Sequence, residues 1–385
     1  MDFTYDEEQL ALQDAVRGLL ATSYGDFGRR RRATAEEPGF DPHLWGRLAG
    51  MGVLGLPFPE QVGGSGAGPL EVGIVAAELG RVLAPEPFLT SVVLAGGLVA
   101  AVAPTAQATS LLEPLAEGAS LLTLAHQEPG RRWHTGARRT TAHEADGGWR
   151  LSGVKEPVPA GAQADRLVVS ARVPDGATAL FVVDGGTAGL QRSDYRVPDG
   201  RRAARVVLEQ VAAVPLGEVV DRQEALADAL DRTRAAAFAE VVGGMDAALT
   251  ATTAYLRSRV QFGVPLSSFQ ALKFRAADMY VALELTRSLV LWATMRLADR
   301  AGEADRSSRS DDAVARAGLQ VSGAARLVFE EAVQLHGGIG MTAEYAVGHH
   351  LTRLTVLEGL LGNGDHYRQQ LVAGVRAHAE LDPLT

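Results

Sequence analysis

The C-terminal part of the chain, residues 222–385, repeats apolar residues at helical spacing over four long stretches. These stretches run over about 224–259, 267–302, 309–336 and 344–378, with short polar or glycine-containing joints between them. Long helices that each carry an apolar face, joined by short connections, pack side by side. The pattern therefore predicts an up-down four-helix bundle.

The two preceding regions differ in pattern from the bundle and from each other. Residues 1–118 show further helical periodicity broken by loops, whereas residues 119–221 hold short apolar or alternating runs separated by turns such as Asp184-Gly185-Gly186. Short runs with such turns indicate antiparallel strands. We therefore predict an α+β multidomain fold: an N-terminal helical domain (1–118), a central antiparallel β barrel or sandwich (119–221) and the C-terminal four-helix bundle (222–385).

Composition excludes several classes of function. The net charge of −9 argues against a general nucleic-acid binder, and the absence of cysteine excludes disulfides, cysteine-ligated zinc and iron-sulfur clusters. The longest apolar run, 92–103, is shorter than the roughly 20 residues that cross a bilayer. The acidic N-terminus differs from a signal peptide. We expect a cytoplasmic protein with no metal site and no membrane or nucleic-acid partner.

Two short runs in the C-terminal part contain the candidate ligand-binding residues. The first, Arg259-Val260-Gln261-Phe262-Gly263, ends one helix and precedes Pro265, so that a guanidinium and an aromatic ring project from a helix-helix corner. The second, Gln334-Leu335-His336-Gly337-Gly338-Ile339-Gly340, lets the backbone approach a ligand closely. Taken singly, the first run also fits a plain helix C-cap and the second an ordinary loop.

Together the two runs, with Tyr255 four residues before Arg259, resemble the acyl-CoA dehydrogenase family, whose members are flavoproteins of fatty acid metabolism. A glycine-rich turn at 57–66 is similar to another loop of that family. The resemblance covers essentially the whole chain and implies the architecture predicted above. It also implies FAD as cofactor, an acyl-CoA substrate and an electron-transfer flavoprotein as acceptor. The expected assembly is a homotetramer or a heterotetramer with a related chain.

In this family FAD lies between the β domain and the bundle, and a neighbouring subunit completes each site. Carried over, the guanidinium would pair with the FAD pyrophosphate, the aromatic rings would pack on the adenine, and the glycine run would reach the adenosine side. The residues that the resemblance assigns to these contacts are Arg259, Gln261, Phe262, Phe269, Gln270, Gln334, Gly337 and Gly338.

On the flavin-ring side the sequence departs from the family pattern. Gln127-Glu128-Pro129 stands where the family has Thr-Glu-Pro, and Pro157 stands where many members carry a tryptophan beside the flavin. Pro159 replaces a threonine, and proline donates no hydrogen bond. We expect Gln127 and Pro157 to face the ring. Flavin binding would then be weak, or shared with a different partner chain.

Desaturation of a thioester needs a general base, for which a buried glutamate with a raised pKa is suited. The family's C-terminal base position falls on Leu361, which cannot accept a proton, and Glu358, three residues earlier, is a candidate base if the local loop is three residues out of register. The helix-borne base position of branched-chain members falls on Thr233-Arg234, which we expect to lie at the substrate. Glu240, two turns further in an apolar stretch, is either the base or half of an ion pair with Arg234 or another bundle arginine.

Three functions remain open from the sequence. The first is an FAD-dependent acyl-CoA dehydrogenase that desaturates its substrate at the α,β position with hydride transfer to flavin N5. The second is a non-catalytic partner subunit of a heteromeric acyl-CoA dehydrogenase. The third is a flavin monooxygenase on the same fold.

Overall fold

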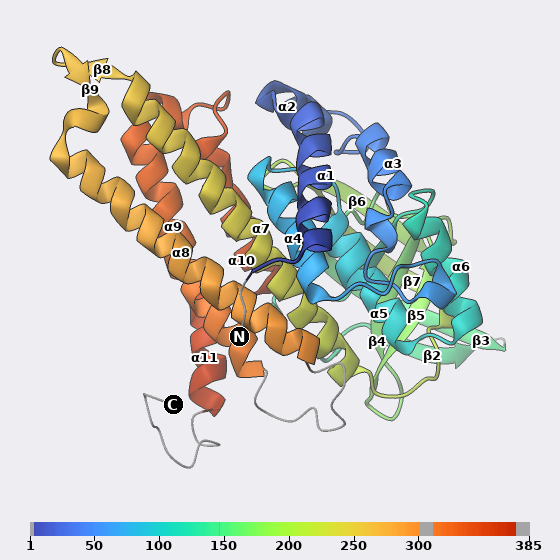
Figure 1. Ribbon diagram of the computed structural model, residues 1–385. Helices are drawn as coiled ribbons and strands as arrows, with labels where there is room; N and C mark the ends of the chain where they lie inside the picture. Colours follow the sequence, from blue (N-terminus) through green and yellow to red (C-terminus); the bar gives the residue numbers. More distant parts are fainter. Residues whose placement is uncertain (1–3, 146, 300–310, 375–385) are drawn as a thin grey trace.

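The computed structural model describes residues 4–145, 147–299 and 311–374, in three parts that follow the chain order (Figure 1). Helices form the first part, a sheet the second, and long helices the third, which confirms the predicted fold class. The helices before the sheet are α1 (Glu7–Tyr24), α2 (Phe27–Ala35), α3 (Pro42–Gly50), α4 (Pro69–Arg81), the π-helix η3 (Phe88–Gly96), α5 (Gly97–Val102) and α6 (Thr105–Ala116).

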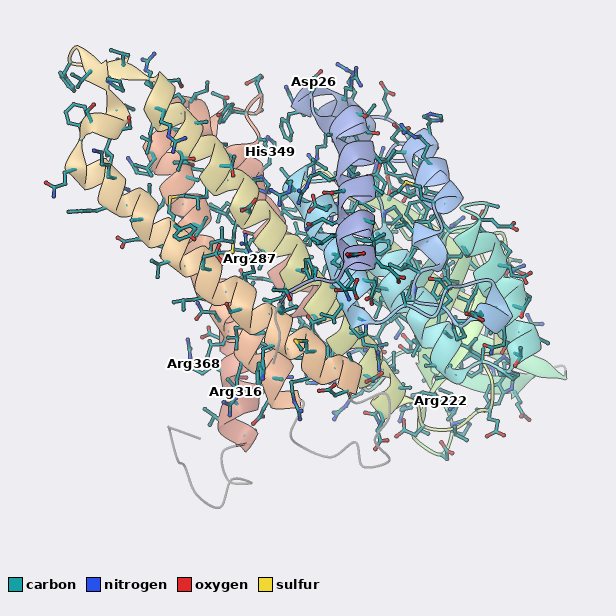
Figure 2. The ribbon with its side chains drawn as sticks, viewed as in Figure 1. Asp26, Arg222, Arg287, Arg316, His349 and Arg368 are labelled. Carbon is teal, nitrogen blue, oxygen red and sulfur yellow. The ribbon has the colours of Figure 1, made fainter. Side chains whose placement is uncertain are left out.

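The first helices begin where the sequence supplies caps. The side chain of Asp6 accepts from the backbone N–H of Gln9, whose own side chain returns to Asp6 and completes a capping box on α1. Asp26 and Asp41 cap α2 and α3 through their side-chain oxygens, which accept from the otherwise unpaired backbone N–H groups of Gly28 and His43. Phe27, the first residue of α2, packs with a tilted ring on His349 at a centroid distance of 4.8 Å. Figure 2 labels His349 and Asp26, which immediately precedes Phe27.

The central part is one seven-stranded sheet that closes on itself. Its order is β1-β4-β2-β3-β7-β5, β4 also pairs with β5, and β6 pairs with β7. Fifteen buried apolar side chains fill the interior as a separate core. The strands are β1 (Leu122–Ala125), β2 (Thr141–Ala145), β3 (Gly148–Pro159), β4 (Arg166–Arg172), β5 (Thr178–Asp184), β6 (Leu190–Arg196) and β7 (Arg202–Pro215).

The observed sheet adds two features that the sequence pattern did not indicate. Most pairings are antiparallel as predicted, but β4 runs parallel to both β1 and β2. The strands β2 and β6 carry mostly polar residues, with only Ala142 fully buried among the two. A strand with few apolar residues gives a weak alternating signal, because its side chains face solvent.

The third part is built from five helices in the described ranges. They are α7 (Gln223–Ser258), α8 (Gln270–Asp299), α9 (Asp311–His336), α10 (Val347–Leu361) and α11 (Gly364–Gly374). The stretch predicted as one helix over 344–378 is therefore two helices, and its last four residues lie outside the described ranges. The break falls at Gly362, whose φ of +130° is closed to other residues, and Asn363 then accepts from the backbone N–H of His366.

The bundle packs directly against the N-terminal helices. A Cβ on Gly80 of α4 would lie 1.9 Å from the carbonyl oxygen of Glu240, and one on Gly243 of α7 would lie 1.9 Å from that of Ala77. The two helices therefore approach at backbone contact, which only glycine permits. One hydrophobic core runs through both helical parts. This contact fixes Glu240 between α4, the sheet and the bundle.

Candidate functional site

The corner between α7 and α8 projects from the far end of the bundle, away from the sheet (Figure 1). It is a small hairpin of β8 (Val260–Gln261) and β9 (Val264–Pro265), followed by a short 3-10 turn. Phe262 at its tip is 91% exposed and has a φ of +53°. Its ring meets Phe269 edge to face at a centroid distance of 6.2 Å.

The structure places the second run beside this corner. Tyr255, in the last turn of α7, stacks on His336 at 4.7 Å, and His336 directly precedes the turn η6 (Gly337–Met341). Nδ1 of His336 bonds the carbonyl of Ala332, and burial lowers the pKa of this histidine. His336 is therefore a structural link that holds the two predicted runs together.

The residues of the two runs that the resemblance assigns to FAD lie mostly on the surface of this chain. Arg259, Gln261, Phe262, Gln270, Gln334, Gly337 and Gly338 are exposed, and Phe269 is half-buried. An exposed arginine with flat rings and uncovered glycine backbone fits a pyrophosphate and an adenine. We call these eight residues the corner site.

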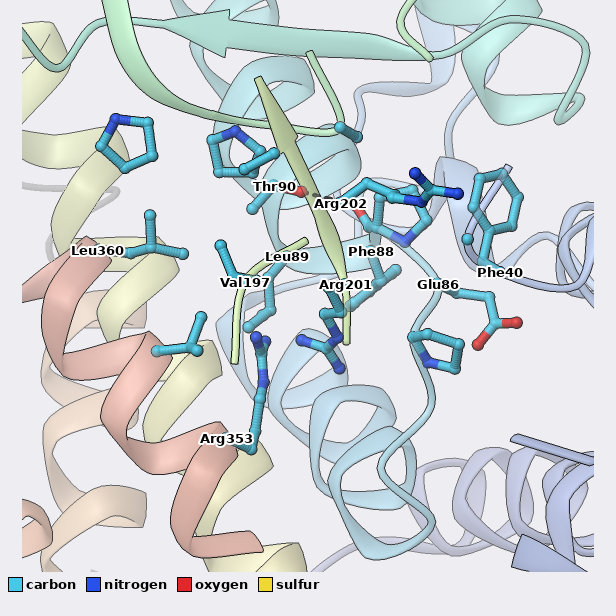
Figure 3. A pocket seen from close by; sticks show the side chains of 18 of the residues that line it. Phe40, Glu86, Phe88, Leu89, Thr90, Val197, Arg201, Arg202, Arg353 and Leu360 are labelled. Carbon is cyan, nitrogen blue, oxygen red and sulfur yellow. Dashed lines mark hydrogen bonds between the residues drawn. The ribbon is translucent and has the colours of Figure 1, made fainter. Parts of the chain in front are cut away.

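A cavity of about 320 Å³ lies between the sheet, the N-terminal helices and the bundle (Figure 3). Glu240 of α7 and Arg353 of α10 form part of its lining, together with Arg201 from the turn before β7. Pro157 and Leu360 line both this cavity and a smaller neighbouring pocket. Gln127, Thr233 and Arg234 line the smaller pocket. Four residues predicted to contact the flavin ring or the substrate therefore lie around this smaller pocket: Gln127, Pro157, Thr233 and Arg234.

Glu240 is the centre of a buried ion network. Arg353 donates two hydrogen bonds to it, from Nε to Oε1 at 2.7 Å and from Nη2 to Oε2 at 3.2 Å. Arg201 adds a contact of 3.4 Å to Oε1, and Arg353 also reaches Asp199 at 3.0 Å. Burial raises the pKa of Glu240 to about 7, which the charge of Arg201 opposes. The bidentate contact with Arg353 further favours the carboxylate and occupies both of its oxygens.

The arginine partner of Glu240 is thus a bundle residue other than Arg234. Arg234 instead pairs with Asp231 at 2.7 Å and donates from Nε to the carbonyl of Leu361 at 2.8 Å. It holds the end of α10, where the family places its C-terminal base. The hydroxyl of Thr233 donates within its own helix, to the carbonyl of Ala229 at 2.7 Å.

Glu358 faces away from the cavity. It lines a small pocket between α7, α9 and α10, and its side chain pairs with Arg326 of α9 at 2.9 Å. Burial raises the pKa of Glu358, and Arg326 opposes that shift. Leu361, at the base position itself, is apolar. The geometry therefore separates Glu358 from Pro157 and from the residues that line the cavity.

The flavin-ring side is closed by direct contacts between the sheet and α10. Gln127 Nε2 donates to the carbonyl of Leu360 at 2.7 Å, and Trp133 Nε1 donates to that of Gly359 at 3.2 Å. The Trp133 ring also packs on His366 at 4.9 Å. The pocket left between these contacts measures about 50 Å³, much smaller than the several hundred Å³ typical of a cofactor site.

The residue Glu128 of the Gln-Glu-Pro loop has a structural role. Its carboxylate accepts backbone N–H groups of Arg138, Arg139 and Thr140 and pairs with Lys155 at 3.4 Å. Lys155 is fully buried and also donates to the carbonyl of His126 at 3.0 Å. Although burial opposes it, this set of donors lowers the pKa of Glu128 to about 2. The pair anchors the loop that carries Gln127.

Sequence reasoning did not identify Arg353, Arg201, Lys155 or Trp133. Lys155 lies 27 residues beyond Glu128 in the chain, so spacing did not link the two. The two arginines approach Glu240 from positions far apart in the chain, where spacing carries no information. Trp133 adopts a φ of +63°, which is rare for an aromatic residue and has no sequence signature.

The two ends of a bound FAD would meet different surroundings. The exposed arginine, rings and glycines of the corner site fit its pyrophosphate and adenosine. At the ring end, Trp133 and Gln127 bond directly to the end of α10, and the residues present do not fit a flavin ring. Among the described residues we find no cluster of metal-ligating side chains and no helix long and apolar enough to cross a bilayer.

Comparison with known proteins gives matches over both helical parts. Residues 6–119 match the acyl-CoA dehydrogenase N-terminal domain, and residues 224–375 match the acyl-CoA dehydrogenase C-terminal domain. The chain is 31% identical over 377 residues to acyl-CoA dehydrogenase FadE27 of Mycobacterium tuberculosis, covering 94% of this chain and 95% of that protein.

Solved structures agree over the whole chain. The Tcur3481-Tcur3483 steroid ACAD has 32% identity and a TM-score of 0.85, covering 96% of this chain and 98% of that chain. The ChsE4-ChsE5 complex from Mycobacterium tuberculosis has 27% identity and a TM-score of 0.88, covering 99% of this chain and 100% of that chain.

Proposed function

Because the chain belongs to the acyl-CoA dehydrogenase family of FAD-dependent oxidoreductases, we propose that it is the partner subunit of a heteromeric acyl-CoA dehydrogenase. In this role its corner site binds the pyrophosphate and adenosine of an FAD whose ring lies in a related chain. That chain supplies the general base. The assembly desaturates an acyl-CoA thioester at the α,β position and passes electrons to an electron-transfer flavoprotein.

The closed ring side carries this proposal. Gln127 and Trp133 bond to the carbonyls of Leu360 and Gly359, so the sheet and α10 already meet where a flavin ring would separate them. Breaking both contacts would leave two backbone carbonyls and two side-chain donors unpaired, at a cost of about 1–3 kcal/mol for each buried group. A flavin in this chain would have to offset that cost.

The carboxylates near the cavity support the same conclusion. Both oxygens of Glu240 accept hydrogen bonds from Arg353, and Glu358 lies on the other side of α10 beside Arg326. A general base needs a free oxygen within reach of the substrate proton. Neither Glu240 nor Glu358 provides one, so we propose that this chain leaves proton abstraction to its partner.

The corner site supports the proposed role of this chain in binding the pyrophosphate and adenosine of FAD. Its residues are exposed on this chain, and an exposed guanidinium gains little until a second surface and an anion cover it. Two of the similar solved structures carry paired names, Tcur3481-Tcur3483 and the ChsE4-ChsE5 complex. They suggest a related but different chain as the partner.

The test is to purify the chain alone and after co-expression with a related acyl-CoA dehydrogenase chain, and to record the flavin absorbance of each. We expect the chain alone to be colourless and the mixed assembly to be yellow. Within the yellow assembly, Arg259→Ala in this chain should weaken FAD binding about 10- to 100-fold, the loss expected for a charge-assisted hydrogen bond. Arg257→Ala, two residues earlier and also exposed, is the matched control and should leave FAD bound.

A further variant tests whether this chain supplies the catalytic base. In the mixed assembly, Glu358→Gln in this chain should leave turnover unchanged, because that carboxylate pairs with Arg326 outside the cavity. A chain that purifies alone as a yellow, active homotetramer would overturn the proposal and support the self-sufficient dehydrogenase instead.

A further inference from the structure

The loop between β1 and β2 carries Trp133 to the end of α10. Nε1 of Trp133 donates to the carbonyl of Gly359 at 3.2 Å, and its indole packs on the ring of His366 in α11 at 4.9 Å. Trp133 lines the smaller pocket together with Gln127 and Pro157, the two residues expected to face the flavin ring. The indole therefore fills space between the sheet and the bundle, beside those two residues.

The loop is fixed on both sides of Trp133. Nε2 of the buried His126 ring bonds to the carbonyl of His134, the residue directly after Trp133, at 2.6 Å. The carboxylate of Glu128 accepts three consecutive backbone N–H groups, those of residues 138–140. These contacts lie within the sheet part and do not involve α10. The position of the indole is therefore set by the loop's own hydrogen bonds as well as by its contact with the bundle.

This arrangement destabilises the chain in two ways. Trp133 has a φ of +63°, in the left-handed region that aromatic residues rarely adopt. Oε1 of Gln127 and Nε2 of His366 are buried without a hydrogen-bond partner among the described residues. Strained backbone and unpaired buried polar atoms are both unfavourable, and strain of this kind concentrates at functional sites. Stability alone therefore does not explain the position of Trp133.

The pocket beside the indole adjoins the cavity of about 320 Å³. Six residues line both spaces: Leu89, Thr90, Pro157, Pro159, Arg353 and Leu360. An indole is flat and covers about 150–250 Å² of surface. When a large side chain is removed from rigid surroundings, the void persists and binds flat aromatic molecules. Without the indole, the pocket and the cavity would therefore offer a flat opening of the kind that a flavin ring needs.

We infer that Trp133 is the specificity-determining residue that keeps a flavin ring out of this chain, because its indole occupies the space that the ring would take. The inference rests on the proposed function and deepens it, since it assigns the exclusion of the ring to one side chain. Gln127 does not close the site by itself. It reaches the carbonyl of Leu360 through a flexible side chain, which a ligand can displace.

The experiment measures the binding of riboflavin to the full-length chain purified alone. Riboflavin carries the flavin ring without phosphate or adenosine, so its binding depends neither on the corner site nor on a partner chain. Quenching of riboflavin fluorescence gives the dissociation constant. We expect Trp133→Gly to bind riboflavin at least about tenfold more tightly than the unchanged chain, as for an opened aromatic site. Glycine suits the φ of +63° at this position, so the loop keeps its path.

Two control variants separate the effect of the indole from that of the loop. Trp133→Phe keeps an aromatic ring in the same place and should exclude riboflavin as the unchanged chain does. Arg132→Gly, at the exposed neighbouring position, gives the loop the same added flexibility and keeps the indole, so it should also exclude riboflavin. Trp133→Asn makes a second opening if Trp133→Gly fails to fold, because asparagine also tolerates a positive φ.

Riboflavin binding by the unchanged chain would overturn the inference, whether or not the variants fold. A folded Trp133→Gly or Trp133→Asn chain that binds no riboflavin would also overturn it, as would an equal gain in Arg132→Gly. If the chain alone is colourless and the folded Trp133→Gly chain binds no riboflavin, the partner role stands and the role of Trp133 fails. If riboflavin enters only after Trp133→Gly, and Arg259→Ala in the mixed assembly leaves FAD bound, Trp133 excludes the ring and the proposed role of the corner site fails.

Discussion

The cavity and the corner site are opposites in how their charges are satisfied. At the cavity, Arg353, Glu240 and Asp199 are buried and bond to one another from three separate segments. At the corner, Arg259 and Phe262 are exposed at the tip of the bundle. The cavity is complete within one chain, whereas the corner site has the residues of a ligand site without the enclosure.

This difference predicts where each region acts. Buried ion networks are costly when broken, because removing one partner leaves the other desolvated and unpaired. Exposed polar residues contribute little to folding, so a change there acts on binding. Substitutions at the cavity should therefore alter the stability of this chain, and substitutions at the corner should alter the assembly while the chain stays equally stable.

The largest effect is expected for Arg353→Leu. The substitution removes both hydrogen bonds to Glu240 and the contact to Asp199, leaving two carboxylates buried in low-dielectric surroundings. Breaking a buried ion pair by removing one partner costs about 3–5 kcal/mol. Urea unfolding followed by tryptophan fluorescence measures this as a fall in the free energy of unfolding.

The control is Arg368→Leu, on α11 of the same bundle. Arg368 pairs with Asp365 at 2.5 Å, and both side chains are mostly exposed. Its loss should cost less than about 1 kcal/mol. Equal effects of the two substitutions would mean that the network at the cavity does not hold the chain together, and the contrast between the two regions would fail.

A second effect concerns the pH dependence of stability and involves Glu86 of the cavity lining. Burial raises the pKa of Glu86 to about 7, and the hydrogen bond from Tyr24 opposes this shift. A raised folded-state pKa means that the folded chain binds the extra proton. This contribution is fully present below about pH 4.5 and is lost as the pH rises through 7. The difference corresponds to about 3 kcal/mol.

We therefore expect the free energy of unfolding to fall between pH 5 and pH 8.5 by more in the unchanged chain than in Glu86→Gln. Glutamine keeps an oxygen to accept from Tyr24 and the backbone N–H of Asp41, and it does not titrate. Unfolding measured at both pH values for both chains gives the difference. An equal change in the free energy of unfolding for the two chains would show that the pKa of Glu86 is not raised and that water reaches this part of the cavity lining.

The architecture was predictable because it depends on local patterns. Helical periodicity, turn dipeptides and polar joints each depend on residues that are close together in the sequence. They were sufficient to predict the order of the three parts: helices, then a sheet, then the bundle. Two kinds of structural feature were not predicted from the sequence. Thr141–Ala145 and Leu190–Arg196 form strands with few apolar residues, and the break at Gly362 divides what appeared to be one helical stretch.

The chemistry of the site was only partly predictable. The sequence indicated that Glu240 is buried and that either catalysis or an ion pair explains it, and the structure shows the ion pair. Its partner, Arg353, lies more than a hundred residues along the chain, a distance over which spacing is uninformative. Trp133 was equally hidden, because its contact with Gly359 depends on a rare backbone conformation and on tertiary packing.

The smallest and sharpest effect is expected at the tip of the corner. Phe262 has a φ of +53°, a conformation that costs an aromatic residue about 1–2 kcal/mol and that asparagine tolerates. Phe262→Asn should therefore leave the unfolding free energy of the chain unchanged or raise it by up to about 1 kcal/mol. In the mixed assembly the same change removes a ring from the adenine side and should weaken FAD binding by roughly fivefold, as expected for one lost aromatic contact.

The control is Phe262→Tyr, which keeps the aromatic ring and should keep the affinity for FAD. Fluorescence titration of FAD and urea unfolding on the same samples separate the two effects, and a variant that lost stability and kept FAD would place Phe262 in the fold instead of the interface.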